Sequence, residues 1–365
     1  MALDRIILSP FRNHLETRIE GTAKFNLLYG ENGAGKTNVL EAISLFAPGR
    51  GLRRAKLEEM AANGGTGGFA VSARLLAGGE PVQLGTGITA AQPGKRIVQV
   101  NEATAPAVRL GEWLSIGWLT PAMDRLFVEG AGARRRFLDR LVLALDPAHA
   151  RRATRLDNAI RERNRLLSQV PPPEPAWLDA VEAQIAEVGA EVAQARGQAI
   201  ANLQEALAAL PDAPFARPSL AYEPGGPTER SALAAALVEA RPRDIAAQRT
   251  LTGPHRDEMA VTMAGKGQPA ADCSTGEQKA MLIAIVLAHS QLLEEAEPGE
   301  RRPRLLLLDE VAAHLDPVRR EALFDRLREG SAQVWLTGTE LAPFEAIREE
   351  AAIWEVRGGQ VVRVT

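Results

Sequence analysis

Cysteine is almost absent from this sequence. Cys273 is the single cysteine among 365 residues. One thiol cannot form an internal disulfide, and it excludes a zinc site built from several cysteines. We therefore expect a protein of a reducing compartment. Any metal ion that it binds is expected to have oxygen ligands.

Long apolar segments are also missing. The longest uninterrupted apolar run, Ala280 to Ala288, is far shorter than the roughly 20 residues of a membrane-spanning helix. The first residues show no basic stretch followed by a sustained apolar one, so no signal peptide is expected. The sequence thus predicts a cytoplasmic protein without a membrane partner, with the apolar run in a buried helix.

An excess of positive charge is a third absence. The net charge is −3, whereas domains dedicated to nucleic acid are usually basic, so any contact with DNA must be local. The hydrophobic fraction of 45% and the charged fraction of 24% are typical of a globular protein. At this length one hydrophobic core is unlikely to suffice, and two lobes are expected.

A phosphate-binding loop lies near the N-terminus, between a predicted strand at Phe25–Tyr29 and a predicted helix from Thr37 to Phe46. Its residues are Gly30, Glu31, Asn32, Gly33, Ala34, Gly35, Lys36 and Thr37. Glycines allow backbone N–H groups to surround phosphates, Lys36 reaches the β and γ oxygens, and the Thr37 hydroxyl takes a position on Mg²⁺. The pattern predicts an ATP site.

An acidic pair completes this site far along the chain. Asp309 and Glu310 follow the apolar run Arg304 to Leu308, which is typical of a strand buried on both faces of a parallel sheet. Ligands of such sheets bind at the carboxyl ends of the strands. We expect Asp309 to hold Mg²⁺ and Glu310 to orient or deprotonate the attacking water, so that Lys36, Asp309 and Glu310 are the catalytic residues.

The segment between the loop and the pair predicts an inserted lobe. Residues 64–104 favour a small antiparallel sheet, and two long helical patterns follow, at Ala133–Leu167 with a break at Asp146-Pro147 and at Trp177–Leu210. We predict an α/β fold with a split sheet and three parts. These are residues 1–118 and 246–365, which form an ATPase head, and residues 119–245, which form the helical lobe.

Two interpretations of the segment before the apolar run remain open. Ser274 or Thr275 is an ordinary N-cap for a helix, and Glu277 is spaced to complete a capping box. Alternatively, Ser274, Thr275, Gly276 and Glu277 form a second phosphate-binding surface. Such a surface is useful only if it closes on the ATP of a second copy in a head-to-tail dimer.

Together, the loop, the Ser-x-Gly-Glu segment and the acidic pair resemble the motifs of an ABC-type ATPase, in which Asp316 would cross the dimer joint. Within that superfamily the chain is similar to the RecF family, which is related to SMC proteins. The residues that carry this likeness are Pro10–His14, Gly30–Asn38, Arg134–Asp139, Gly253–Asp257 and the Ser-x-Gly-Glu segment. The resemblance implies that Asn38, Arg12 and Asn13 also contact the nucleotide.

The chain departs from related patterns at three places. RecF proteins commonly carry leucine where Cys273 stands and glutamine where Glu277 stands. Glutamate is usual at the second position in SMC relatives, so the contact with the γ-phosphate is expected to be kept. Transporter-type cassettes place a histidine after the strand that follows the acidic pair, where this chain has Leu336-Thr337-Gly338-Thr339. A missing imidazole would hold the γ-phosphate less firmly, which is typical of slow hydrolysis used as a timer.

The resemblance further implies a weak, DNA-stimulated ATPase with ATP and Mg²⁺ as cofactors. It implies binding of double-stranded and gapped DNA at single-strand/double-strand junctions, an ATP-dependent homodimer, and action with RecR, RecO and RecA in repair, replication restart and the SOS response. Candidate DNA contacts are Arg134, Arg135, Arg151 and Arg155. For Arg134 and Arg135 a bracing role is an equal alternative, whereas Arg151 and Arg155 are more typical of a solvated helix face. His255 and Arg256 are either near the nucleotide or structural.

Three rival functions agree less well with the sequence. An ABC transporter subunit would keep its cassette contiguous and would normally carry the missing histidine. An SMC-type chromosome tether would need a much longer helical arm. A nuclease related to these ATPases would need a metal-nuclease domain after Glu310, where the remaining chain is short.

Overall fold

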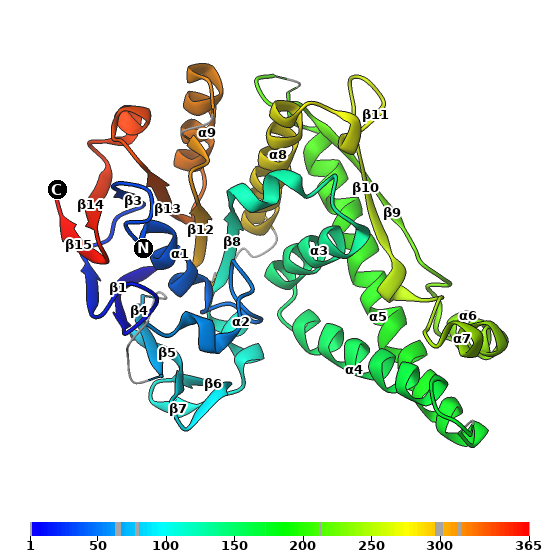
Figure 1. Cartoon of the computed structure of the whole chain (residues 1–365). Helices are drawn as coiled ribbons and strands as arrows, with labels where there is room; N and C mark the ends of the chain where they lie inside the picture. Colours follow the sequence, from blue (N-terminus) through cyan, green and yellow to red (C-terminus); the bar gives the residue numbers. More distant parts are fainter. Residues whose placement is uncertain are drawn as a thin grey trace. The chain divides into compact units, whose positions relative to one another are not determined.

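The computed structural model describes residues 2–62, 67–76, 80–171, 173–211, 213–295, 302–312 and 315–364. The chain divides into two compact units (Figure 1). The first, here called the head, combines Met1–Met123 with Leu293–Thr365. The second, here called the lobe, is Asp124–Leu292. The head is therefore assembled from both ends of the sequence, as predicted from the split sheet.

A six-stranded, mostly parallel sheet is the centre of the head. Its strands lie in the order β15 (Gln360–Arg363), β14 (Ala351–Arg357), β3 (Phe25–Tyr29), β13 (Gln333–Gly338), β12 (Arg304–Leu308) and β8 (Ser115–Leu119). β3 pairs in parallel with β13 and β14, β12 pairs in parallel with β13 and β8, and β15 is antiparallel to β14. The predicted strands at Phe25 and Arg304 are confirmed, whereas β8 was not predicted.

A second sheet of the head is antiparallel. Its strands lie in the order β2 (Thr17–Glu20), β1 (Leu3–Ser9), β4 (Phe69–Leu75), β5 (Val82–Thr89), β6 (Gln92–Val100) and β7 (Ala103–Thr104). It is larger than the small sheet predicted at residues 64–104, because β1 pairs with both β2 and β4. Residues 64–66 and 77–79 of that prediction lie outside the described residues.

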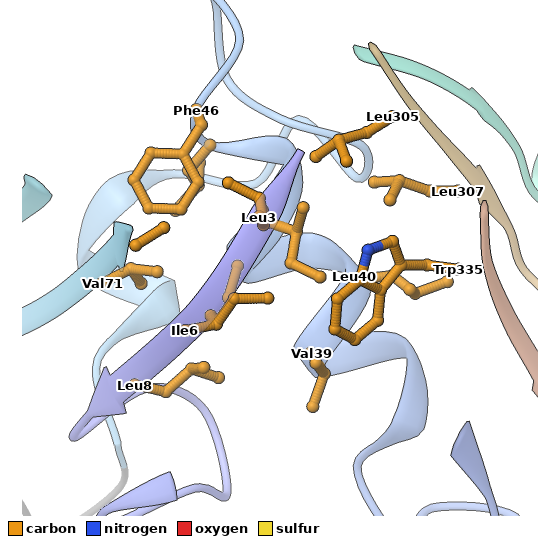
Figure 2. Packing of buried hydrophobic residues seen from close by; sticks show 14 of the residues in the cluster. Leu3, Ile6, Leu8, Val39, Leu40, Phe46, Val71, Leu305, Leu307 and Trp335 are labelled. Carbon is orange, nitrogen blue, oxygen red and sulfur yellow. The ribbon is translucent and has the colours of Figure 1, made fainter. Parts of the chain in front are cut away.

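Helix α1 (Lys36–Ser44) packs between these two sheets. Figure 2 shows Val39 and Leu40 of α1 with Ile6 of β1 on one side and Leu307 and Trp335 of the parallel sheet on the other. All five are buried, and burial of each large apolar side chain favours folding by about 1.5–3 kcal/mol. The core thereby fixes the helix that follows the phosphate-binding loop.

The remaining helices of the head are short or lie outside this core. They are α2 (Leu110–Trp113) and α9 (Pro317–Glu329). Among the described residues, short 3-10 helices of the head are Leu57–Met60, Ala107–Arg109 and Ala342–Ile347. Those of the lobe are Pro254–Arg256 and Ala270–Asp272, and Pro121–Arg125 lies at the boundary of the two units.

The lobe contains helices and a small sheet. Its helices are α3 (Ala131–Leu145), α4 (His149–Leu167), α5 (Pro175–Ala208), α6 (Arg230–Glu239), α7 (Arg241–Ala247) and most of α8 (Thr275–Glu295). The sheet has the order β11 (Gln268–Pro269), β10 (Glu258–Met263) and β9 (Pro218–Glu223). The break at Asp146-Pro147 and the two long helices are confirmed. Apolar side chains of α4, α5 and α6, such as Leu156, Ile185 and Leu233, form a shared core.

The predicted lobe boundary at residue 245 was wrong. The compact unit extends to Leu292 and includes the segment from β10 to most of α8. Long-range contacts explain this extension, because β10 pairs along its whole length with β9. The guanidinium of Arg134 also forms two hydrogen bonds of 2.7 Å with the Glu258 carboxylate. The Ser-x-Gly-Glu segment therefore belongs to the lobe and not to the head.

A buried ion network around Arg196 holds the lobe together. Arg196 of α5 donates to both carboxylate oxygens of Asp139 at 2.9 Å and to Asp257 Oδ2 at 2.9 Å. Burial opposes the charge of Arg196, but Asp139 and Asp257 outweigh it and raise its pKa. His149 Nε2 and the Tyr222 hydroxyl bond to the same two carboxylates, at 2.8 and 2.6 Å. The network joins the Arg134–Asp139 and Gly253–Asp257 segments.

None of the helices in the described ranges combines the length and apolar character needed to cross a lipid bilayer.

We predict that Arg196→Met destabilises the lobe by about 3–5 kcal/mol, because it leaves the carboxylate of Asp257 buried without its cation. Urea unfolding followed by far-UV circular dichroism measures the loss. Arg165→Met is the matched control, since it removes an arginine from an exposed pair with Glu162, worth at most about 1 kcal/mol. Equal losses in the two variants would contradict a central role for Arg196.

Candidate nucleotide site

The phosphate-binding loop has the backbone geometry that its glycines predict. It connects the end of β3 with the start of α1, and the φ angles of Gly30, Gly33 and Gly35 are 151°, 80° and 117°. A Cβ atom at Gly30 would lie 2.2 Å from the carbonyl oxygen of Val356. Only glycine fits at position 30, because any larger side chain would collide with the neighbouring main chain.

Lys36 lies inside the loop. Its Nζ donates to the carbonyl oxygens of Gly30 at 2.6 Å and Glu31 at 2.9 Å. Burial lowers the pKa of Lys36, and the charges of Glu310 and Asp309 partly offset that effect. A cation fixed at the centre of a loop at a helix N-terminus is suited to bind phosphate.

Asp309 joins the two distant parts of the sequence. The Thr37 hydroxyl donates to Asp309 Oδ1 at 2.8 Å, and the Thr337 hydroxyl donates to the same oxygen at 2.8 Å. Burial raises the pKa of Asp309, whereas the bonds from Thr337 and Thr37 lower it. The structure thus brings Asp309 and Thr37 together, while their role as Mg²⁺ ligands stays a prediction.

These oxygen donors fit Mg²⁺. A hydroxyl and a carboxylate at hydrogen-bonding distance are the one or two protein ligands that Mg²⁺ usually takes, with phosphate and water oxygens completing its octahedron. The described residues contain no cluster of three or more histidine, cysteine or acidic side chains that would suggest a different metal.

Glu310 has an unusual backbone. Its φ angle is 55°, in the left-handed region that residues other than glycine seldom adopt. Its N–H donates to the Thr337 hydroxyl at 2.9 Å, which supports this conformation. Residues in such sparsely populated backbone conformations cluster at functional sites. The left-handed conformation of Glu310 turns the chain at the end of β12.

Thr337 was missed by the sequence analysis as a site residue. It was noted only within the segment that lacks a histidine, yet its side chain contacts both members of the acidic pair. The available signal was its position at the end of β13, which lies between β3 and β12 in the sheet. Residues at the carboxyl ends of neighbouring parallel strands meet at one edge.

The Arg12–Asn13 segment supports the loop from the side. Arg12 binds the buried Glu41 carboxylate through two hydrogen bonds of 2.9 and 2.7 Å. Asn13 Nδ2 donates to the carbonyl oxygen of Ala34 at 2.9 Å, and Asn13 Oδ1 accepts from Asn38 at 2.7 Å. Asn13 thus contacts the loop directly, whereas most donors of Arg12 are directed at protein groups.

Three further residues around the loop were not predicted as site residues, although His14 lies in the Pro10–His14 segment that carries the family likeness. His14 Nε2 lies 3.0 Å from the carbonyl oxygen of Gly35, and burial lowers the pKa of His14, which favours the neutral ring. Arg53 donates to Glu41 at 3.0 Å and to Asn38 at 2.6 Å. Glu41 belongs to α1, which follows the loop directly, whereas tertiary packing brings His14 and Arg53 to it.

The Ser-x-Gly-Glu segment begins α8, in the lobe. Ser274 N and Oγ both donate to Glu277 Oε2, at 2.9 and 2.8 Å, and Glu277 N donates to Ser274 Oγ at 3.4 Å. The capping box is therefore present in the single chain. Thr275 and Gly276 occupy the first turn of the helix. The second interpretation, that the same residues form a surface for the ATP of another copy, stays a prediction.

Asp316 is the N-cap of α9. Its Oδ1 accepts from Arg319 N at 3.0 Å, and its side chain is about half exposed. The nearby residues Ala313 and His314 lie outside the described residues. A role for Asp316 at a dimer joint stays a prediction.

The arginines proposed to contact DNA divide into two kinds. For Arg134 the contacts favour the bracing alternative, because its side chain is bound to Glu258 and to the carbonyl oxygen of Phe127. Arg135 donates to the Asp257 carbonyl oxygen at 2.8 Å and is only partly exposed. Arg151 and Arg155 are exposed on α4.

The Gly253–Asp257 segment has mainly a structural role within the lobe. His255 Nε2 bonds to the carbonyl oxygen of Thr250 at 2.9 Å, and burial lowers the pKa of His255. Asp257 accepts from Arg196, Tyr222 and the Gly225 N–H. The structural alternative for His255 is thus the one its contacts favour, whereas Arg256 is exposed.

Comparison with known proteins identifies the family. The family model for the RecF/RecN/SMC N-terminal domain matches residues 2–360. The chain is 44% identical to the DNA replication and repair protein RecF of Mesorhizobium japonicum, over 98% of this chain and 97% of that protein. It is 43% identical to the protein of the same name from Brucella abortus, over 100% and 97% of the two chains.

Solved structures agree with this result at the level of the fold. The structure of the recombination mediator protein RecF-ATP in the RecFOR pathway has a TM-score of 0.87 and 23% identity, covering 100% of this chain and 98% of that one. An Smc head domain from Pyrococcus furiosus has a TM-score of 0.54 and 16% identity, covering 100% and 96%. The chain therefore belongs to the RecF family, a branch of the RecF/RecN/SMC group with the fold of an ABC-type ATPase head.

Proposed function

We propose that the protein is an ATP-dependent DNA-binding recombination mediator that recognises single-strand/double-strand junctions at gaps. The observation that carries the ATPase part of this proposal is the pair of hydrogen bonds from Thr37 and Thr337 to Asp309. They unite the phosphate-binding loop, the acidic pair and the following strand at one sheet edge, where ATP hydrolysis requires them.

Each residue of the site has a role in this proposal. Backbone N–H groups at the end of the loop and at the start of α1, together with the ammonium of Lys36, bind the phosphates of ATP, and Asn13 and Asn38 support the loop. Thr37 and Asp309 hold Mg²⁺, which neutralises charge on the phosphate oxygens. Glu310 orients the attacking water and accepts its proton.

Thr337 positions the acidic pair, because its hydroxyl bonds to Asp309 and to the backbone of Glu310. It lies in the segment Leu336–Thr339, which lacks the histidine of transporter-type cassettes. The missing imidazole supports slow hydrolysis, suited to a timed release from DNA.

We expect Thr337→Val to lower ATP turnover about tenfold while ATP affinity changes little, because the backbone of Glu310 loses its support. Steady-state phosphate release and equilibrium binding of a fluorescent ATP analogue separate the two quantities. Thr337→Ser retains the hydroxyl and should keep turnover near the wild-type rate. A Thr337→Val variant with unchanged turnover would remove Thr337 from the site.

A second copy completes the site in this proposal. The Ser274 hydroxyl and the N–H groups of the first turn of α8 bind the γ-phosphate of ATP held by the partner copy, and Asp316 lies at the joint. The support comes from the Ser-x-Gly-Glu pattern at the start of a long helix and from the exposure of Asp316. The active species is then a head-to-tail dimer that encloses two ATP molecules.

Sedimentation should show a monomer without nucleotide and a dimer with ATP and Mg²⁺. Glu310→Gln should still bind ATP and should form a longer-lived dimer, with turnover lowered by about 100-fold or more because the base is lost. A dimer that is indifferent to ATP would contradict the shared site. Full turnover in Glu310→Gln would contradict the role of Glu310.

The DNA-binding part of the proposal rests on the family. RecF relatives are DNA replication and repair proteins, and the solved RecF-ATP structure is described within the RecFOR pathway. We accordingly propose gapped and double-stranded DNA, RecR, RecO and RecA as partners in repair, replication restart and SOS induction, in the cytoplasm. Arg151 and Arg155 of α4 are the exposed candidates for phosphate contacts.

Gapped DNA should bind about tenfold or more tightly than blunt duplex in the presence of ATP, with a smaller difference in its absence. Fluorescence anisotropy at fixed salt measures both affinities, since phosphate contacts depend strongly on salt. Arg151→Ala/Arg155→Ala should weaken binding to both DNAs by a similar factor, because phosphate contacts carry no information on structure. Equal affinity for the two DNAs would contradict junction recognition.

A further inference from the structure

A lysine lies directly on the carboxylate of the Ser-x-Gly-Glu segment. Lys266 Nζ donates to Glu277 Oε1 at 2.5 Å, while Glu277 Oε2 accepts from Ser274 N and Oγ. The two carboxylate oxygens of Glu277 are thus divided between a cation and the serine. Lys266 is 52% exposed and Glu277 24% exposed, so the pair lies at the surface of the lobe.

Local structure fixes the position of Lys266. It precedes Gly267 in the tight turn between β10 and β11, where Gly267 has a φ of 62° and its N–H donates to the Met263 carbonyl oxygen at 2.8 Å. After the turn, Gln268 Nε2 donates to the carbonyl oxygen of Asp272 at 2.7 Å. The turn is therefore tied to the chain that leads into Ser274.

Glu277 poses an electrostatic difficulty for phosphate binding. Hydrogen bonds with Lys266 and then with Ser274 lower the pKa of Glu277 to about 2, so this side chain is fully negative at neutral pH. A negative charge beside the Ser274 hydroxyl opposes the approach of a phosphate, since like charges repel at this range. A neutral glutamine at this position would carry no such charge.

We propose that Lys266 is a positioning residue that makes the Ser274–Glu277 surface competent to bind the γ-phosphate of ATP held by a second copy. The inference rests on the proposed head-to-tail dimer. Lys266 neutralises Glu277, and it keeps a partner on the carboxylate when the Ser274 hydroxyl turns away from Glu277 toward the phosphate. Lysine and glutamate at these positions together do what a neutral glutamine does alone.

The strength of the ATP-dependent dimer tests this proposal, compared between one single variant and one double variant. Lys266→Met should weaken the ATP-dependent dimer about tenfold, measured as the dimer dissociation constant by sedimentation with saturating ATP and Mg²⁺. Lys266→Met/Glu277→Gln should restore the constant to within about threefold of wild type, because the uncompensated charge is gone. Arg165→Met, which breaks another exposed ion pair of the lobe, should leave it unchanged.

The possible outcomes separate this inference from the proposed function. Wild-type protein that remains monomeric with ATP contradicts the shared site, and the inference falls with it. A wild-type dimer that forms equally well in Lys266→Met contradicts the inference alone. A defect in Lys266→Met that Glu277→Gln does not rescue also overturns it, since Lys266 would then act on the nucleotide or on folding and not through Glu277. Matching thermal unfolding of all variants shows that each is folded.

Discussion

The hydrogen bonds of the Asp309 carboxylate with Thr37 and Thr337 are the constraint on which the nucleotide site depends. They require β12, β13 and β3 to be neighbours in one parallel sheet, so that three strand ends from both halves of the chain meet at one edge. Parallel neighbours need long connections, and here one connection is the whole lobe. The site therefore forms only when the two ends of the sequence have paired, and ATP binding is expected to stabilise that pairing.

The lobe is organised by a different kind of interaction. Its buried ion network places Arg196 between Asp139 and Asp257, and removing one partner from such a network is costly. The two segments that carry much of the RecF likeness supply these carboxylates, so their principal contribution is to the architecture of the lobe. The same architecture includes β10, the turn with Lys266 and the start of α8. The surface proposed to meet a second copy is thus held by contacts far from any ligand.

Sequence patterns predicted the head better than the lobe. The loop, its helix and the acidic strand have strong local signals, namely spaced glycines and an uninterrupted apolar run. The lobe boundary failed because the pairing of β9 with β10 and the bonds of Arg134 to Glu258 connect segments more than thirty residues apart. The local composition of each segment does not indicate with which distant segment it pairs. For the same reason Arg134 looked like a DNA contact, since an arginine's partner across the fold is invisible in the sequence.

By itself, the sequence predicted the chemistry that we propose for the protein: a loop for phosphate, a carboxylate pair for Mg²⁺ and water, and a helix start suited to a second phosphate contact. These are short-range properties, set by residue type and spacing within a few positions. Only the tertiary structure decided that Thr337 holds the pair, that Glu41 holds Arg12, and that Lys266 covers Glu277. Each of these contacts depends on strand order or on a turn that brings a distant side chain within 3 Å, which spacing along the chain does not encode.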